Sequence, residues 1–320
     1  MNLLEIKNLQ MDFGAGAGAA RAIDGVSLAI GVGETVCLVG ESGCGKSVTA
    51  QSIARLVPVP PANYVAGEIM QNGCDTQKMS PAELRGIRGG VVSYDFQDPG
   101  AALNPVFRIG AQIKESLKLH RPEKANDAEV LRLLKLVGIP APESRIKNYP
   151  FEMSGGMQQR VMIAMALASE PKLLVADEPT TALDVTIQAQ ILDLLRDLKQ
   201  RLGMAILLIT HNLGIVGDMA DRVAVMYAGQ IVELAPAREL LRQPLHPYTK
   251  ALMHSVPKLR GGADRLSAIP GNVPRIGDFP SGCRFAPRCP VARPECSQKI
   301  PELLEVQPGR FVRCPFWKAE

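Results

Sequence analysis

One segment of eight residues fixes the fold class of this chain. It fits the pattern G-x-x-x-x-G-K-[ST] and reads Gly40-Glu41-Ser42-Gly43-Cys44-Gly45-Lys46-Ser47. An apolar run at 35–39 precedes it and predicts a buried strand, and a helix is predicted from about 46 to 56. Between a strand and a helix, such a loop can wrap its N–H groups around phosphate oxygens at the positive end of the helix. The segment therefore predicts an α/β protein with a phosphate-binding loop.

The residue types in this loop suit a nucleoside triphosphate. The glycines allow the backbone to approach the phosphates closely. Lys46 is expected to reach the β- and γ-phosphates, and Ser47 is expected to ligate Mg²⁺. A glycine-rich turn without a ligand is the alternative, and the strand and helix on either side of the loop argue against it.

Two carboxylates and a histidine follow later strands. Asp177 and Glu178 end an apolar strand predicted over 173–176. Asp177 is placed to hold Mg²⁺ through its water shell, and Glu178 to polarise an attacking water as general base. His211 comes after the strand predicted at 205–209, where it could bond a γ-phosphate. A solvated acidic pair and a surface histidine are the alternatives.

The order of strands and helices predicts a mostly parallel sheet covered on both faces. Residues 1–255 are expected to form one domain, into which a helical subdomain of about 98–160 is inserted. A hairpin is predicted around Ala228-Gly229. From 256 to 320 the hydrophobic periodicity fades, so this part is predicted to be an appended, largely irregular module.

Composition excludes several functions. The longest apolar run has eight residues, against about 20 for a membrane-spanning helix, and the first residues do not resemble a secretory signal. A cytosolic location is therefore expected. The net charge is +4, with +5 in residues 256–320 and −1 in the rest. Such a neutral main domain argues against a nucleic-acid partner.

Taken together, the motifs resemble those of ATP-binding cassette (ABC) ATPases over residues 1 to about 255. The matching residues are the phosphate loop, Gln97, Ser154-Gly155-Gly156-Met157-Gln158, Asp177-Glu178, Ala182-Leu183-Asp184 and His211, in the order of that family. The resemblance implies ATP hydrolysis in a P-loop ABC domain that carries an antiparallel β subdomain and a helical subdomain.

The resemblance also implies a head-to-tail dimer of two such domains. ATP would lie between the phosphate loop of one subunit and Ser154, Gly155 and Gly156 of the other, which begin a helix. Gln97 resembles the glutamine that touches Mg²⁺ or the attacking water, and Asp184 resembles the aspartate that links the two sites. Phe13 resembles the aromatic residue that stacks on adenine, with ordinary packing as the alternative.

Three further segments resemble the ATP-binding subunits of dipeptide and oligopeptide importers, a group that includes nickel importers. The first is Gln97-Asp98-Pro99 followed by Leu103-Asn104-Pro105-Val106, and the second is Ser154–Leu167, which reads SGGMQQRVMIAMAL. The third is Leu245-His246-Pro247-Tyr248-Thr249-Lys250-Ala251-Leu252. His246 is interpreted as part of a rigid turn and not as a metal ligand, because the following proline fixes the backbone. Two residues depart from the family pattern: Met153 stands where leucine is usual, and Asp95 stands where an apolar residue is usual. Because Asp95 is charged, the sequence does not predict how its strand packs.

Membership of this group implies a peripheral protein at the cytoplasmic face of the cell membrane. The partners would be a second, paralogous ATPase, two integral membrane permease subunits and an extracytoplasmic solute-binding protein. The transported solute is set by those other subunits. An importer of nickel or another small solute, a soluble ABC ATPase and a regulatory metal-sensing subunit remain alternatives.

Four of the seven cysteines are grouped in the last 38 residues: Cys283, Cys289, Cys296 and Cys314. In a cytosolic protein, such a group indicates metal binding more often than disulfides. Four thiolates suit a [4Fe–4S] cluster or Zn²⁺, and the spacing is wider than in most structural zinc sites. In relatives of this group such a tail resembles an iron–sulfur site. Free thiols are the third alternative, and a bound metal is expected to be structural.

Overall fold

The computed structural model describes residues 2–14, 16–181, 183–255 and 269–318. They belong to two compact units. The first comprises Gly31–Glu34 and Met79–Leu208, and the second comprises Asn2–Ile30, Thr35–Lys78 and Ile209–Glu320. Strand β8 (Ala205–Thr210) runs from the first unit into the second.

In the first unit, two neighbouring strands carry the residues of interest at their carboxyl ends. Strands β6 (Val92–Asp95) and β7 (Leu173–Asp177) pair in parallel, with Val92 opposite Leu173. Every residue of β7 is buried, as expected for a parallel strand covered on both faces. The expectation of parallel strands is thus confirmed for this pair.

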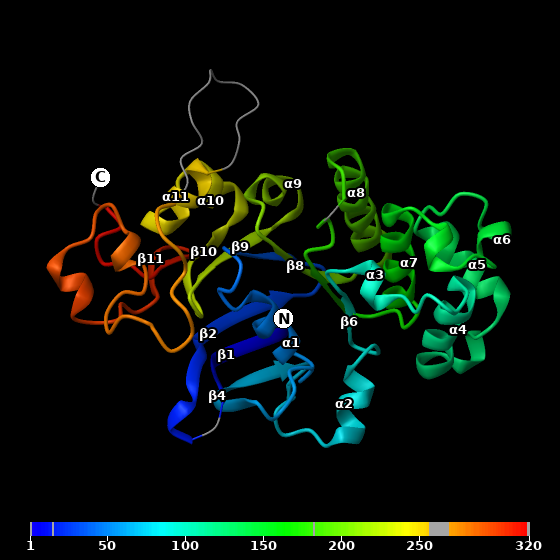
Figure 1. Ribbon diagram of the computed structural model, residues 1–320, viewed down its shortest axis with the longest axis horizontal. Coiled ribbons are helices and arrows are strands. Elements are labelled where there is room, and N and C mark those ends of the chain that lie inside the picture. The colour runs from blue at the N-terminus through cyan, green and yellow to red at the C-terminus, as the bar shows by residue number, and fades with distance from the viewer. Residues whose placement is uncertain (1, 15, 182, 256–268, 319–320) are drawn as a thin grey trace. The chain divides into compact units, whose positions relative to one another are not determined.

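Helices make up most of the first unit (Figure 1). They are α2 (Pro81–Ile87), α3 (Pro99–Ala102), α4 (Ile109–His120), α5 (Asp127–Leu136), α6 (Pro142–Arg145), α7 (Gly155–Leu167) and α8 (Val185–Leu202). Helices α3 to α6 fall within the residues predicted to form a helical subdomain. The longer helices α4 and α5 are amphipathic and bury one face each; for example, Ile109, Ile113 and Leu117 of α4 are fully buried.

The second unit contains an antiparallel sheet formed mainly by the N-terminal strands. Its order is β2 (Ala20–Gly31), β1 (Asn2–Phe13), β4 (Ala62–Gln71) and β5 (Cys74–Asp75). Strand β1 pairs with β4 in antiparallel register, with irregularities between Lys7 and Met11. This sheet matches the expected antiparallel β subdomain.

A second group of strands in this unit carries the phosphate loop. Strand β3 (Thr35–Val39) pairs in parallel with β9 (Arg222–Tyr227), and β9 turns through Ala228-Gly229 into antiparallel β10 (Gln230–Pro236). The predicted hairpin is therefore confirmed. The helices of this unit are α1 (Lys46–Ser52), α9 (Val216–Met219), α10 (Ala237–Arg242) and α11 (Pro247–His254).

The described part of the C-terminal segment is more regular than the sequence predicts. Strand β12 (Arg310–Val312) pairs with β10, and β11 (Leu304–Gln307) pairs with β12, both antiparallel. Much of what precedes them is loop, as expected. The short 3-10 helices of the chain lie at Gly16–Gly18, Pro122–Lys124, Pro150–Glu152, Leu213–Ile215, Ala286–Arg288 and Pro294–Ser297.

None of the helices in the described residues has both the length and the apolar character that a bilayer-crossing segment requires.

Candidate functional site

The phosphate loop lies between β3 and α1, where the sequence predicts it. A Cβ on Gly40 would lie 2.2 Å from the carbonyl oxygen of Met226, so any side chain there would collide with the backbone of β9. Gly45 caps α1 with a φ of 105°, and a Cβ on it would lie 2.7 Å from Ile23. Both positions therefore need glycine for packing and for backbone conformation, since the φ of Gly40 is 155°.

Lys46 is folded back over its own loop. Its side chain is buried, and Nζ donates hydrogen bonds to the carbonyl oxygens of Gly40 at 2.9 Å and Glu41 at 3.0 Å. These acceptors hold the ammonium group inside the curve of the loop. Ser47 lies in the first turn of α1, next to Lys46. The loop thus places a cation and a hydroxyl together at a helix N-terminus, which is an anion-binding arrangement.

In the first unit, the ends of β6 and β7 bring Gln97 and Glu178 together. Nε2 of Gln97 donates to Oε2 of Glu178 at 3.0 Å, and the hydroxyl of Thr181 donates to the same oxygen at 2.9 Å. Glu178 has a left-handed backbone, with φ 51°, and follows the buried Asp177. Strain of this kind is often found at functional sites. The sequence analysis did not predict Thr181 as a site residue. Its position three residues after Glu178 could have indicated a hydroxyl near that carboxylate.

Asp95 lies at the end of β6, below these groups. It is fully buried, and Nε2 of Gln159 donates to its Oδ2 at 2.7 Å. Burial raises the pKa of Asp95 to about 8, and the nearby charge of Asp177 acts in the same direction. This shift favours the neutral carboxylic acid, the form whose burial at the end of a strand costs less free energy.

The segment that resembles the ABC signature begins α7. Ser154 is the exposed N-cap residue, Gly155 is exposed, and Gly156 is buried. A Cβ on Gly156 would lie 2.6 Å from Cγ2 of Ile187, so glycine lets α7 and α8 approach closely. Asp184 caps α8 by accepting the N–H of Ile187 at 3.0 Å. Ala182 lies outside the described residues.

Two further residues predicted for the site lie at the ends of strands, His211 after β8 and Phe13 in β1. His211 is exposed directly after β8, and Phe13 is partly exposed at the end of β1. His246 is buried and caps α11, where its Nδ1 accepts the N–H of Tyr248 at 3.0 Å. The interpretation of His246 as part of a rigid turn is therefore confirmed.

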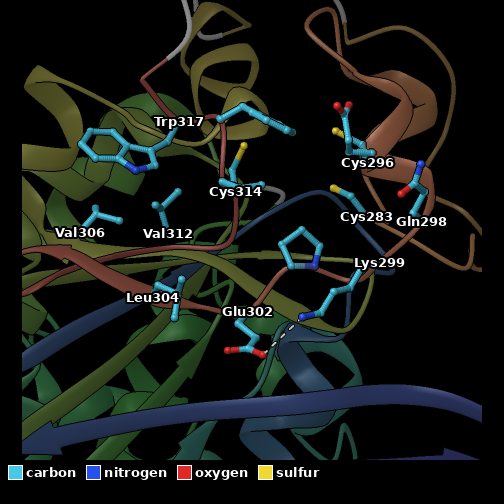
Figure 2. Close-up of a pocket in the computed structure, with 14 residues that line it drawn as sticks. Cys283, Cys296, Gln298, Lys299, Glu302, Leu304, Val306, Val312, Cys314 and Trp317 are labelled. Carbon is cyan, nitrogen blue, oxygen red and sulfur yellow. Dashed lines mark ion pairs between the residues drawn. The ribbon is translucent and has the colours of Figure 1, made fainter.

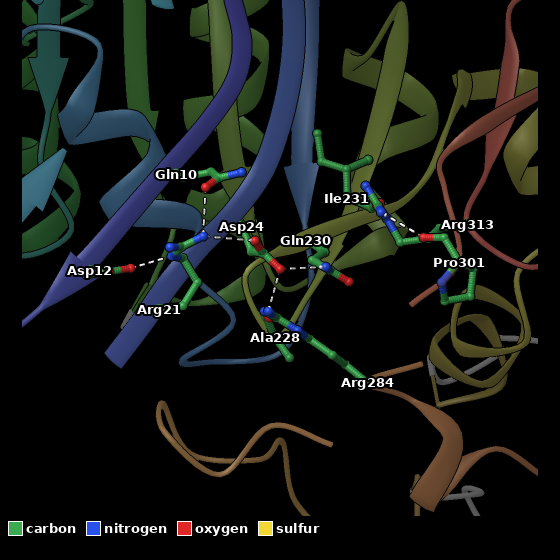
Figure 3. A network of polar contacts seen from close by, with 10 residues as sticks. All are labelled: Gln10, Asp12, Arg21, Asp24, Ala228, Gln230, Ile231, Arg284, Pro301 and Arg313. Carbon is green, nitrogen blue, oxygen red and sulfur yellow. Dashed lines mark hydrogen bonds and ion pairs between the residues drawn. The ribbon is translucent and has the colours of Figure 1, made fainter. Parts of the chain in front are cut away.

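The C-terminal segment is joined to the rest of the second unit by arginines. Figure 3 shows Asp24 of β2 accepting from Arg21, Gln230 and Arg284, the last at 2.6 Å. Arg284 also donates to the carbonyl oxygen of Ala228. Arg288 forms an ion pair with Glu41, and the hydroxyl of Tyr248 accepts the N–H of Glu41. Sequence reasoning missed these contacts to the phosphate loop.

The four C-terminal cysteines border one small cavity of about 20 Å³, together with Phe285 and Phe316. Cys283, Cys296 and Cys314 also line a larger cavity of about 630 Å³ (Figure 2). Burial raises the pKa of Cys314 to about 11, and the other three thiols act in the same direction. Within the part of the chain that the structure describes, however, no three His, Cys, Asp or Glu side chains are grouped so that they could hold a metal ion.

Comparison with known proteins gives matches over both parts of the chain. Residues 23–181 match the family model described as "ABC transporter", and residues 232–296 match "Oligopeptide/dipeptide transporter, C-terminal region". A probable peptide ABC transporter ATP-binding protein of Sinorhizobium fredii is 50% identical over 99% of this chain and 95% of its own length. The oligopeptide transport ATP-binding protein AppD of Bacillus subtilis is 49% identical over 99% and 98%.

Solved structures agree with these matches. A dimeric, post-hydrolysis structure of the ATP-binding cassette MJ0796 bound to ADP and Pi has a TM-score of 0.64 at 28% identity, covering 73% of this chain and 99% of that one. The structure of cbiO1 from Clostridium perfringens, part of the ABC transporter complex cbiONQ, has a TM-score of 0.65 at 26% identity, covering 76% and 91%.

Proposed function

Because this chain belongs to the family of ATP-binding subunits of peptide ABC transporters, we propose that it hydrolyses ATP to power the import of dipeptides or oligopeptides across the cytoplasmic membrane. It is an ABC ATPase. The proposal rests mainly on sequence identity of about 50% to named peptide transporter subunits over nearly the whole chain. The geometry of the phosphate loop agrees with it, because Lys46 is held inside the loop.

The chemistry is an in-line attack of water on the γ-phosphate. Glu178 polarises that water, and Gln97 and Thr181 orient the carboxylate through their hydrogen bonds to Oε2. Lys46 exchanges the loop carbonyls for the β- and γ-phosphates. His211 bonds the γ-phosphate, and Phe13 stacks on the adenine.

Three side chains supply oxygen ligands of the kind that Mg²⁺ prefers, namely Ser47, Gln97 and Asp177. Bound there, Mg²⁺ neutralises charge on the phosphates. The hydroxyl of Ser47 opens α1, and Asp177 lies buried at the end of β7, so both donors are on rigid elements.

A second copy or a paralogue completes the site. Helix α7 begins with Ser154, Gly155 and Gly156, of which the first two are exposed. This helix N-terminus binds the γ-phosphate held by the partner subunit. Asp184 lies at that dimer interface. The dimeric form of the cassette MJ0796 supports this arrangement.

Two permease subunits and an extracytoplasmic solute-binding protein are the remaining partners, and the chain is peripheral to the membrane. The helical part of the first unit offers a contact surface, because Val106, Phe107 and Phe151 are exposed and a cavity of about 420 Å³ is bordered by Phe107 and α4. An exposed apolar surface of this kind often marks a protein interface. The relation of cbiO1 to the cbiONQ complex supports such an assembly.

The cysteines hold a [4Fe–4S] cluster with a structural role. A single tetrahedral Zn²⁺ would bring four sulfurs to within about 3.8 Å of one another, a consequence of Zn–S bonds of about 2.3 Å. The four thiols border a common cavity of about 20 Å³, but in the described residues they are not grouped closely enough to hold a metal ion. The proposal therefore rests on the number and type of ligands, since four thiolates suit a [4Fe–4S] cluster or Zn²⁺. Anaerobic purification followed by assays for iron, sulfide and zinc tests this. Zinc alone, or none of the three, would contradict it.

Uptake of labelled dipeptides and oligopeptides tests the transport function. Cells that lack this chain are expected to lose uptake, and the wild-type chain but not Glu178→Gln is expected to restore it. Loss of nickel uptake with normal peptide uptake would reassign the solute. Normal uptake of both would contradict an import function.

A further inference from the structure

The C-terminal segment contacts the phosphate loop directly at Glu41, the first residue after Gly40. Nη1 of Arg288 donates to Oε2 of Glu41 at 2.8 Å, and Nη2 donates to Oε1 at 3.0 Å. The pair is therefore bidentate. The Arg288 side chain is only 5% exposed, against 30% for Glu41. Bidentate, largely buried pairs of this kind are stronger and more directional than surface ion pairs.

Arg288 is itself held in place by further contacts. Its Nε donates to the carbonyl oxygen of Pro270 at 2.7 Å, and its guanidinium lies 5.7 Å from the ring centroid of Tyr227. Phe285, three residues earlier, is buried against Tyr227 and Tyr248. The position of the guanidinium is therefore set by the packing of the C-terminal segment.

The backbone of Glu41 is fixed as well. The hydroxyl of Tyr248 accepts the N–H of Glu41 at 2.9 Å, and the ring of Tyr248 is buried against Tyr227 at a centroid distance of 4.6 Å. The other end of the loop contacts the C-terminal segment through the β9–β10 turn. The N–H of Gly229 in this turn donates to the carbonyl oxygen of Cys44, and Arg284 donates to the carbonyl oxygen of the neighbouring Ala228. The loop is thus restrained from the C-terminal side at both ends.

The charge of Glu41 is unfavourable for a loop that must bind a polyanion. A carboxylate in the phosphate loop opposes the approach of the phosphates unless a cation compensates for it. Lys46 cannot do so, because its Nζ is directed to backbone carbonyl oxygens and is the group expected to bind phosphate. Arg288 is the cation that the structure places on both carboxylate oxygens of Glu41.

We propose that Arg288 is a positioning residue for nucleotide binding, which neutralises Glu41 and holds its carboxylate away from the phosphates while Tyr248 fixes the backbone of the same residue. Through this contact the C-terminal segment sets the affinity of the loop for nucleotide phosphates, a role separate from that of any metal at the cysteines.

A double-mutant cycle in the full-length chain tests the proposal, with the Kd for MgATP as the readout. Arg288→Met is expected to raise Kd about fivefold, because one uncompensated charge near the surface changes an ion's binding free energy by about 1 kcal/mol. In a Glu41→Gln background the same substitution is expected to change Kd by less than about twofold, since no carboxylate remains to be neutralised. The affinity for adenosine, which has no phosphates, is expected to stay unchanged.

Two further variants guard against a merely structural effect. Arg288→Lys keeps the charge but loses the bidentate geometry, so its Kd for MgATP is expected to lie between those of the wild type and Arg288→Met. Lys299→Met removes a charge from an exposed site in the same segment and serves as the matched control. An equal loss from Arg288→Met in both Glu41 backgrounds would overturn the proposal. A loss with Arg288→Lys as large as with Arg288→Met would do the same.

Discussion

At the residue scale, the carboxylate of Glu178 is held by other side chains of its own unit. Gln97 and Thr181 both donate to its Oε2, which fixes the direction of the carboxylate. The resemblance to ABC ATPases implies that Gln97 and Glu178 belong to one site, and Glu178 was also predicted from its place after an apolar strand. The sequence does not predict the Arg288–Glu41 pair, since 247 residues separate the two and nothing in the local pattern marks that arginine.

Replacing Glu178 by Gln tests its role in the attack on phosphate. ATP is expected to bind normally, because the amide keeps the size of the side chain, while turnover falls by at least about 100-fold for want of a general base. Turnover under saturating MgATP and nucleotide binding are measured in parallel. Turnover that stays near the wild-type rate would remove Glu178 from this role.

His246 is expected to make stability depend on pH. Burial, followed by the charge of Arg313, lowers the pKa of His246 to about 3 from a usual value of 6.5. Below pH 6.5 the unfolded chain therefore takes up a proton that the folded chain does not, so stability falls as the pH falls toward 3. The loss attributable to this residue is about 1 kcal/mol at pH 5.5.

The comparison variant for this prediction is His246→Asn, which can still cap α11. It is expected to be less stable at pH 7 because of lost packing, yet to lose about 1 kcal/mol less than the wild type between pH 7 and 5.5. Urea unfolding at a series of pH values measures the difference. Parallel pH profiles for the two proteins would disprove the assignment.

At the element scale, α7 and α8 pack closely because residue 156 has no side chain. Gly156→Ala places a methyl group at 2.6 Å from Cγ2 of Ile187, which must shift. A destabilisation of about 1–3 kcal/mol is expected, the range for overpacking. Gly155→Ala is the control, since its Cβ would meet Leu183 at 3.4 Å and should cost nothing in stability. Equal unfolding midpoints for both variants would refute the packing argument.

Prediction of the elements succeeded where the pattern was strong. Strand β3 and the β9–β10 hairpin were predicted from continuous apolar runs around a phosphate loop or a glycine turn. Strand β4 was not identified, because Ala62–Gln71 shows no regular alternation and includes Gly67. Strands β11 and β12 are short, and their pairing with β10 depends on contacts distant in sequence, so local patterns do not reveal them.

At the scale of the whole molecule, the exposed start of α7 allows the proposed dimer to be tested. Glu178→Gln is expected to accumulate as a dimer with ATP, because binding closes the pair and slow turnover keeps it closed. Adding Ser154→Arg is expected to return it to a monomer, since a large side chain at the exposed N-cap blocks the facing nucleotide. Light scattering on a sizing column distinguishes these states, and a monomer for both would contradict the dimer.

The pairing of β12 with β10 has a consequence for shortened versions of this protein. Glu233 and Leu234 of β10 face Val312 and Phe311, and the N–H of Arg313 donates to the carbonyl oxygen of Val232 at 2.8 Å. A chain cut before β11 would leave this row of backbone groups as an open sheet edge. Such an edge invites pairing between molecules, so truncated protein should aggregate unless another strand covers it.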